Sequence, residues 1–250
     1  MKLSLFRLAN WLYSSNYPLY YLLYRNWKAI ADRKERKIAR LILRPGMTVV
    51  DIGANIGVYS RFFSRLIGSE GSVHCFEPDP INFSRLKRNI ASLTNAIAIP
   101  SAVGERTGNI KLYTSDEMNV DHRTFDSGDG RKSIDVPLVA LDDYFRPGHR
   151  VDFMKIDVQG YELNVLLGAK RVLTENHDIK LLMEFWPFGL QKADVNSKDV
   201  VLFLQSLGFS LESIAGYPNE KFDPSELKHF SADSYCNLLI YRKEIGEVLG

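Results

Sequence analysis

The sequence has few cysteines and no long hydrophobic run, and each absence excludes a class of protein. Its 250 residues include two cysteines, Cys75 and Cys236, which do not form a metal-type pair such as CxxC. A disulfide scaffold is therefore excluded. Because both cysteines lie in apolar, strand-like runs, we expect buried free thiols in a reducing cytoplasm. No stretch approaches the ~20 apolar residues of a membrane-spanning helix, and internal repeats are absent.

The overall net charge of +2 is the sum of a basic N-terminal segment and an acidic body. Residues 1–44 contain ten Lys or Arg and two Asp or Glu, a net charge of +8, whereas residues 45–250 contain 22 and 28, a net charge of −6. We expect the first range to be a helical segment and the second to be one large domain. The acidic body disfavours nucleic acid as a partner.

The basic segment is also aromatic, and the sequence leaves two interpretations of it open. It can lie peripherally on an anionic membrane surface, or pack on the core as a helical cap with its charges in solvent. Residues 28–43 have the apolar spacing of a helix that ends before Pro45. The start of the chain does not resemble a signal peptide, because Arg7 and Asn10 interrupt its apolar stretch. The aromatic residues are Phe6, Trp11, Tyr13, Tyr17, Tyr20, Tyr21, Tyr24 and Trp27.

From residue 47 onward, apolar runs of strand length alternate with helical patterns. This order predicts an α/β fold in which a mostly parallel, seven-stranded sheet has helices on both faces. The predicted strands cover residues 47–52, 73–76, 97–103, 151–156, 179–185, 209–214 and 237–242, and the predicted helices cover residues 58–67, 81–93, 161–172 and 197–207.

A polar insertion interrupts this alternation at about residues 104–135. Strand signals at 110–113 and 134–139 predict a hairpin, and the Gly- and Asp-rich middle is typical of a functional or mobile loop. His122 and Arg123 stand in that middle. A histidine there could transfer a proton near neutral pH and an arginine could bind a hydroxyl, unless both are solvated loop residues.

The motif with the clearest chemical meaning is a glycine turn between a strand and a helix. The segment VVDIGANIG places Asp51 at the end of a strand, followed by Gly53, Asn55 and Gly57. Glycine and asparagine both tolerate a positive φ, and glycine lets a ligand lie against the backbone. The spacing departs from the GxGxxG fingerprint of dinucleotide sites. Glu77 ends the next strand, where it can accept both hydroxyls of a ribose, whether of NAD or of another nucleoside.

Four segments in order resemble the FkbM family of methyltransferases: VVDIGANIGVYS, CFEPDP, VDFMKIDVQGYELNVLLGA and LLMEFWP. The resemblance runs from about residue 45 to residue 187. It implies a Rossmann-like class I methyltransferase fold, S-adenosyl-L-methionine as cofactor, and O-methylation, often of sugars or natural products. Gln159 stands where family members often carry Glu.

The resemblance also implies a role for each position at the cofactor. The residues of the glycine turn would line the methionine half, Glu77 would hold the ribose, and Asp157 would face the sulfonium. Ser101 and Ala102 would flank the adenine. The implied cofactor-binding set is Asp51, Gly53, Asn55, Gly57, Glu77, Ser101, Ala102 and Asp157.

Methylation of a hydroxyl needs a base near the transferred methyl group. Asp157, Glu162 and Glu184 all map to the carboxyl edge of the sheet, where open α/β sheets bind ligands. Glu162 could instead stabilise the start of its helix, and Glu184 could be a buried structural acid. His122 is the fourth candidate base. The histidine and cysteine spacings predict no dedicated metal site, although the carboxylates could bind Mg²⁺ loosely.

Two other functions compete with an O-methyltransferase acting on a saccharide or small metabolite. One is an NAD(P)-dependent oxidoreductase, which the missing GxGxxG and the lack of a Tyr-x-x-x-Lys motif disfavour. The other is a non-catalytic module that binds S-adenosylmethionine, which the intact glycine turn and the acid-lined edge disfavour.

Overall fold

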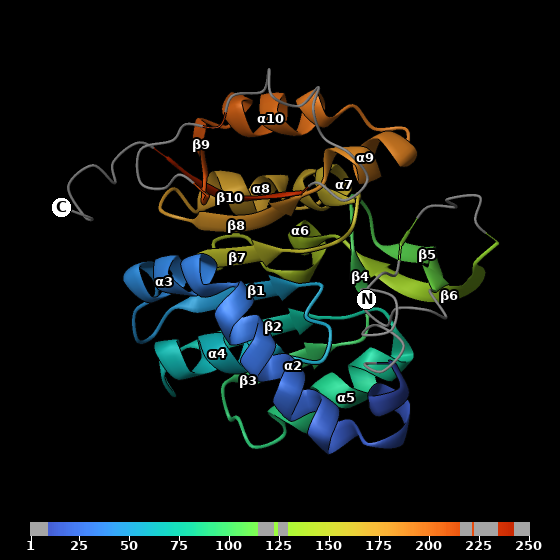
Figure 1. Cartoon of the computed structure of the whole chain (residues 1–250). Helices are drawn as coiled ribbons and strands as arrows, with labels where there is room; N and C mark the ends of the chain where they lie inside the picture. Colours follow the sequence, from blue (N-terminus) through green and yellow to red (C-terminus); the bar gives the residue numbers. More distant parts are fainter. Residues whose placement is uncertain (1–9, 115–122, 125–129, 216–221, 223–234, 243–250) are drawn as a thin grey trace.

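The centre of the molecule is a seven-stranded sheet with the order β3-β2-β1-β7-β8-β10-β9 (Figure 1). β10 runs antiparallel to β8 and β9, and the other neighbouring pairs are parallel. The predicted sheet is thus confirmed. Its strands are β1 (Thr48–Ile52), β2 (Ser72–Phe76), β3 (Ala96–Ile99), β7 (Phe153–Ile156), β8 (Lys180–Phe185), β9 (Phe209–Ser213) and β10 (Cys236–Arg242). This computed structural model describes residues 10–114, 123–124, 130–215, 222 and 235–242.

Helices cover both faces of the sheet because side chains alternate along each buried strand. In β1, Val49 packs in the cluster that includes Phe63 and Leu86, whereas Val50 packs in the cluster that includes Val165 and Leu204. The covering helices on the first face are α3 (Arg33–Ile42), α4 (Val58–Ile67) and α5 (Pro80–Ile90), and those on the second are α6 (Leu141–Tyr144), α7 (Glu162–Leu167), α8 (Lys170–Glu175), α9 (Pro187–Lys192) and α10 (Ser197–Ser206).

Two predicted helices are divided in the structure. The pattern at 28–43 belongs to the end of α2 (Tyr17–Ala31) and to α3, which meet at Asp32. The predicted helix 161–172 is α7 followed by α8. Between α7 and α8, a Cβ on Gly168 would lie 1.9 Å from the carbonyl oxygen of Gly104. The helix is therefore interrupted where another part of the chain approaches its backbone.

The predicted strand 97–103 is also wrong, because it contributes to two sheets. β3 ends at Ile99, and β4 (Ala102–Val103) pairs with β6 (Lys132–Val139) in a three-stranded sheet completed by β5 (Gly108–Thr114). Pro100 lies between them and lacks the N–H that a continuous ladder would need. The predicted hairpin exists as β5 and β6, and the backbone of Arg123 pairs with that of Tyr113.

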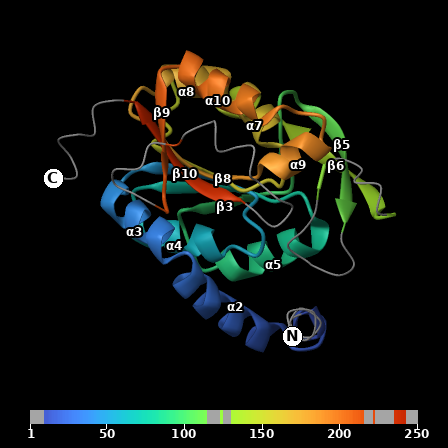
Figure 2. The ribbon, with the colours of Figure 1, turned by 45° about the horizontal axis from the view of Figure 1, so that its top comes forward.

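The N-terminal segment packs on the domain as a cap. Residues 10–15 are helical. Tyr13 and Tyr20 are buried against Ile56, which lies in the glycine turn, and Val58, which follows it. The guanidinium of Arg85 lies 3.7 Å from the ring centroid of Tyr13. Figure 2 shows α2 on the outside of the molecule, so the face of α2 opposite the buried Tyr20 points to solvent. Within the described ranges, no helix has the length and apolar content needed to cross a membrane.

Both cysteines are free, as expected, but their environments differ. Cys75 is buried in β2, whereas Cys236 at the start of β10 is partly exposed. The prediction that both thiols are buried is therefore wrong for Cys236, because the strand that carries it begins at the rim of the sheet.

Candidate active site

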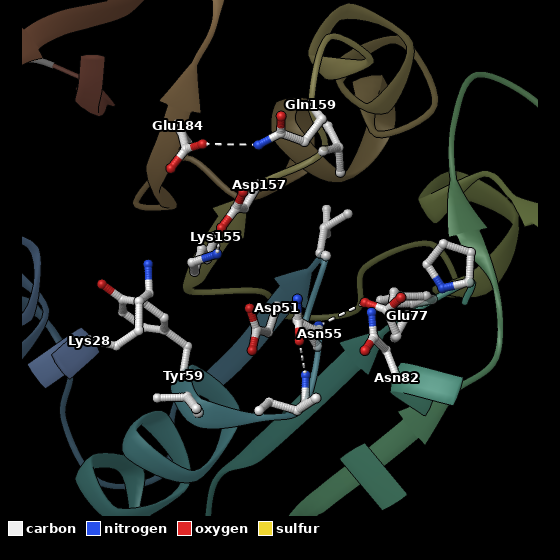
Figure 3. Close-up of a pocket in the computed structure, with 18 of the residues that line it drawn as sticks. Lys28, Asp51, Asn55, Tyr59, Glu77, Asn82, Lys155, Asp157, Gln159 and Glu184 are labelled. Atoms are coloured by element: carbon white, nitrogen blue, oxygen red, sulfur yellow. Dashed lines mark hydrogen bonds and ion pairs between the residues drawn. The ribbon is translucent and has the colours of Figure 1, made fainter. Parts of the chain in front are cut away.

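A cavity of about 710 Å³ opens at the carboxyl ends of β1, β2, β7 and β8. The chain reaches β2 and β3 on one side of β1 and then returns to β7 on the other side. Such a reversal leaves a crevice beyond the strand ends. Figure 3 shows Glu77 and Asn82 at one end of the cavity and Lys28 and Tyr59 at the other, with Asp51 between them.

The glycine turn has two different steric requirements. Gly53 has φ +76°, lines the cavity, and would place a Cβ 2.0 Å from the carbonyl oxygen of Asp157. Gly57 has φ +82° and a Cβ there would meet Leu86 of α5 at 2.7 Å. Gly57 is not among the cavity-lining residues. Its position therefore serves the packing of the turn on α5, whereas Gly53 brings β1 close to the end of β7.

Asp51 has one carboxylate oxygen whose hydrogen bond is not made within the described chain. The side chain is fully buried at the cavity, and Oδ2 accepts from the Ser60 hydroxyl at 2.7 Å. Oδ1 is buried without a partner among the described residues. Burial raises the pKa of Asp51, and the nearby Lys155 opposes this shift. A buried acceptor beside a cavity fits a cationic ligand group such as the ammonium of S-adenosylmethionine.

Glu77 is held at the cavity by backbone donors. Its Oε2 accepts from the N–H of Asn55 at 2.7 Å, and its Oε1 accepts from the N–H of Asp79 at 3.0 Å. Burial raises its pKa to about 8. Each oxygen keeps a lone pair that could accept from a ribose hydroxyl. Ser101, between β3 and β4, and Ala102, the first residue of β4, line the same cavity.

The opposite part of the cavity holds a cluster of ionisable groups from β7, β8 and α2. Lys155 Nζ donates to Asp157 Oδ2 at 2.8 Å, and Gln159 Nε2 donates to Glu184 Oε1 at 3.3 Å (Figure 3). Burial and the charge of Asp157 raise the pKa of Glu184 to about 8. Burial also acts to raise the pKa of Asp157, but Lys155 and Lys28 outweigh it and hold that pKa below its usual value.

Lys155, Lys28 and Gln159 are cavity residues that the sequence analysis did not select. Lys155 had a usable signal, because it stands two residues before Asp157 and strand side chains alternate. No sequence signal pointed to Lys28, since this residue approaches the site only through the packing of α2. There it pairs with Asp32 at 2.7 Å and lies 5.7 Å from the ring centroid of Tyr59.

Of the two remaining predicted catalytic residues, one does not line the cavity and the other is not described. Glu162 is fully buried, does not line the cavity, and accepts from the N–H of Gly160 at 3.1 Å, which favours the structural alternative. Burial raises its pKa to about 8. His122 lies outside the described residues. Its neighbour Arg123 lies 5.1 Å from the ring centroid of Trp186, and Thr124 lines the cavity.

Metal-ligating side chains do not cluster within the part of the chain that the structure describes. Among the described residues, no group of three or more His, Cys, Asp or Glu side chains has an arrangement that could hold a metal ion.

The sheet order and the position of the cavity define a Rossmann-like methyltransferase fold. A putative rRNA methylase from Clostridium thermocellum has a similar fold, with a TM-score of 0.51 and 11% identity over 83% of this chain and 93% of that chain. The sequence model of the methyltransferase FkbM domain family matches residues 51–211 of this chain. The chain therefore belongs to the FkbM methyltransferase family, and the predicted family and its cofactor, S-adenosyl-L-methionine, are confirmed.

Curated relatives include two methyltransferases. The chain is 30% identical over 162 residues to the 2-O-methyltransferase NoeI of Sinorhizobium fredii, a match covering 58% of this chain and 66% of the relative. It is 26% identical over 194 residues to the hexuronic acid methyltransferase AglP of Haloferax volcanii, covering 74% of each. The chain thus spans about two thirds to three quarters of these relatives.

Proposed function

We propose that this protein is an S-adenosylmethionine-dependent O-methyltransferase that methylates a hydroxyl of a saccharide or small metabolite. The observation that carries the proposal is the position of Glu184, a carboxyl with a pKa of about 8, in the same cavity as Asp51 and Glu77. The names of NoeI and AglP, a 2-O-methyltransferase and a hexuronic acid methyltransferase, support a sugar-like acceptor.

The residues of the cavity fit the cofactor in one orientation. The unpartnered Oδ1 of Asp51 would accept from the ammonium of the methionine part, and Glu77 would accept from the ribose hydroxyls. Ser101 and Ala102 would flank the adenine, and Asp157 would lie on the sulfonium side. When bound, S-adenosylmethionine supplies an activated methyl group. By holding the methyl donor and the acceptor hydroxyl in line, a cavity can lower the activation free energy by ~7–11 kcal/mol in favourable cases.

In this proposal Glu184 is the general base. The acceptor hydroxyl would receive the methyl group that the cofactor supplies, and its proton would pass to the ionised Glu184 carboxylate. Gln159 orients that carboxylate through their hydrogen bond. Lys155 and Lys28 offset the negative charge of Asp157 and Glu184. His122 is the second candidate base, and Glu162 is omitted because it does not line the cavity.

The same proposal assigns a part to the regions outside the main sheet. Within the N-terminal segment 1–44, α2 closes one side of the cavity of the methyltransferase domain at 45–250, supported by the cavity-lining residues of this helix. Leu112 and Thr124, which belong to the insertion, line another side. We place the enzyme in the cytoplasm without a nucleic-acid partner, in peripheral contact with the inner membrane surface through the N-terminal segment. The exposed basic residues of that segment support this contact.

Calorimetry with S-adenosylhomocysteine and with NAD tests the cofactor assignment. We expect heat of binding with S-adenosylhomocysteine alone, and binding of NAD alone would favour the oxidoreductase. A mass spectrum of sugar and metabolite extracts incubated with enzyme and S-adenosylmethionine should then show a product heavier by one CH₂ unit. Tight S-adenosylhomocysteine binding without any methylated product would favour the non-catalytic module.

A further inference from the structure

The solvent-facing side of α2 is an apolar surface. Its members recur at helical spacing of three and four residues, and their exposed fractions run from 41% to 77%. Single exposed apolar residues are ordinary on a protein surface, whereas a contiguous patch marks an interaction site. We define the outer face of α2 as Leu19, Leu22, Leu23, Trp27 and Ile30.

The surroundings of the outer face are basic. Residues 1–31 contain no Asp or Glu, and residues 10–44 contain eight Lys or Arg and two Asp or Glu. Exposed basic side chains continue from the end of α2 along α3, at Arg33, Lys37 and Arg40. An apolar helical face beside basic residues is the pattern of a helix that lies in the interface of an anionic membrane. A second copy of the chain would instead place like charges near one another.

The outer face also forms one edge of the active-site cavity. Leu23 and Trp27 line the cavity although they are 51% and 60% exposed. Tyr20, Tyr24 and Lys28 continue the lining on the adjacent side of the same helix. Figure 2 shows α2 at the periphery of the molecule. A surface that received this helix would therefore lie next to the cavity mouth.

We propose that the outer face of α2 docks on an anionic membrane surface and that the acceptor hydroxyl belongs to a membrane-anchored amphiphile. This inference rests on the proposed O-methylation and adds the class of acceptor: a hydroxylated head group, such as a sugar, on an apolar tail. The head group enters the cavity past Leu23 and Trp27, while the tail stays in the bilayer beside the outer face.

Vesicle flotation tests the docking. The probe is a phosphatidylcholine vesicle containing about 30% phosphatidylglycerol, compared with pure phosphatidylcholine, because basic segments are attracted to anionic lipid. The wild-type protein should float with the anionic vesicles. A Leu22→Gln/Ile30→Gln variant should float about tenfold less, because both side chains lose apolar burial in the interface. Neither residue lines the cavity.

The matched control is Ile81→Gln/Leu202→Gln, which changes two helical residues that are 60% and 61% exposed elsewhere on the surface. This control should float like the wild type, and both variants should bind S-adenosylhomocysteine like the wild type. Absence of wild-type flotation, or equal flotation of the two variants, would overturn the docking. So would a wild-type dimer that Leu22→Gln/Ile30→Gln converts to a monomer, because the outer face would then be a protein interface.

The acceptor class is tested with methyl-labelled S-adenosylmethionine. The enzyme is incubated with native membranes and, separately, with the soluble extract of the same cells. Label should enter material that partitions into organic solvent, and the Leu22→Gln/Ile30→Gln variant should incorporate less. Label in water-soluble products alone would overturn this inference but leave the methyltransferase assignment intact. Absence of label in both fractions would count against the proposed function itself.

Discussion

The side chains of Lys155 and Asp157, two residues apart at the end of β7, form an ion pair of 2.8 Å at the cavity. Lys155 is buried, whereas Asp157 keeps 26% of its side chain exposed. Burial acts to lower the pKa of Lys155, but Asp157 and Asp51 raise it by more, so the lysine stays charged. The pair thus keeps a cation among carboxylates that would otherwise repel one another.

Replacing Lys155 by an apolar residue of similar size should reduce both stability and turnover. Lys155→Met removes the buried cation beside Asp51 and Asp157 and leaves only the more distant Lys28 to offset their charge. We therefore expect a loss of ~3 kcal/mol in the free energy of unfolding and at least a ~10-fold loss of turnover. Lys155→Arg should restore part of both. Denaturant titration and a methyl-transfer assay measure these changes, with Lys170→Met, an exposed lysine on α8, as control. Wild-type turnover in a stable Lys155→Met protein would contradict this role.

The pH profile of turnover should report Glu184. A base must be ionised, and its pKa is about 8, so activity should rise as pH increases toward and through about 8. Glu184→Gln should abolish this rise and reduce turnover by ~10²–10⁴-fold, and Asp157→Asn should also reduce turnover strongly. Rates measured across this pH range with the exposed-site control Glu70→Gln provide the comparison. An unchanged profile in Glu184→Gln would transfer the role of base to another residue.

Glu77→Ala should weaken cofactor binding specifically. Above pH 8, where Glu77 is ionised, loss of the carboxylate removes the acceptor for the ribose hydroxyls, at a cost of ~1.5–3 kcal/mol, the scale of hydrogen bonds to a charged group. Calorimetry with S-adenosylhomocysteine measures the change, and Glu70→Ala controls for the loss of an exposed acid. Equal affinity in a folded Glu77→Ala protein would remove Glu77 from the ribose site.

Glu162→Gln distinguishes a structural acid from a catalytic one through stability. The pKa of Glu162 rises from 4.5 to about 8 on folding, so between these values the unfolded chain releases a proton that the native state retains. The contribution of Glu162 to the free energy of unfolding of the wild type therefore falls as pH increases across that window, by up to ~1.4 kcal/mol per pH unit.

The Gln variant lacks this titration, so its stability relative to wild type should increase from pH 4.5 to about 8. Denaturant titration at several pH values tests this. A pH-independent difference together with lost turnover would instead support catalysis by Glu162.

The insertion should act on the acceptor rather than on the cofactor. Arg123 and Thr124 place this part of the chain at Trp186 and at the cavity, so a cover that closes over the acceptor is expected there. His122→Ala should lower turnover while S-adenosylhomocysteine affinity stays nearly unchanged. Steady-state kinetics and calorimetry on the same preparation test this, with His177→Ala, on a distant loop, as control. Full activity of His122→Ala would make the insertion a solvated loop.

Local sequence determined the parts of this protein that depend on neighbouring residues. Alternating apolar residues set the two faces of β1, and the predicted helix at 58–67 agrees with α4 because its pattern and its preceding glycine are local. The turn around Gly53, Asn55 and Gly57 was recognisable because few residues tolerate its positive φ. The family followed from these ordered segments.

Tertiary structure decided which side chains share the cavity. Tyr13 donates to Asn82, which is 69 residues away in sequence, and this docking brings α2 and Lys28 to the site. The close approach of Gly104 to Gly168 divides a helix that the periodicity predicted as continuous. Hydrophobic periodicity reports which side of an element is buried but not which element buries it. The neighbours of Glu184, the burial of Glu162 away from the cavity lining and the exposed outer face of α2 therefore depend on the packing of distant segments.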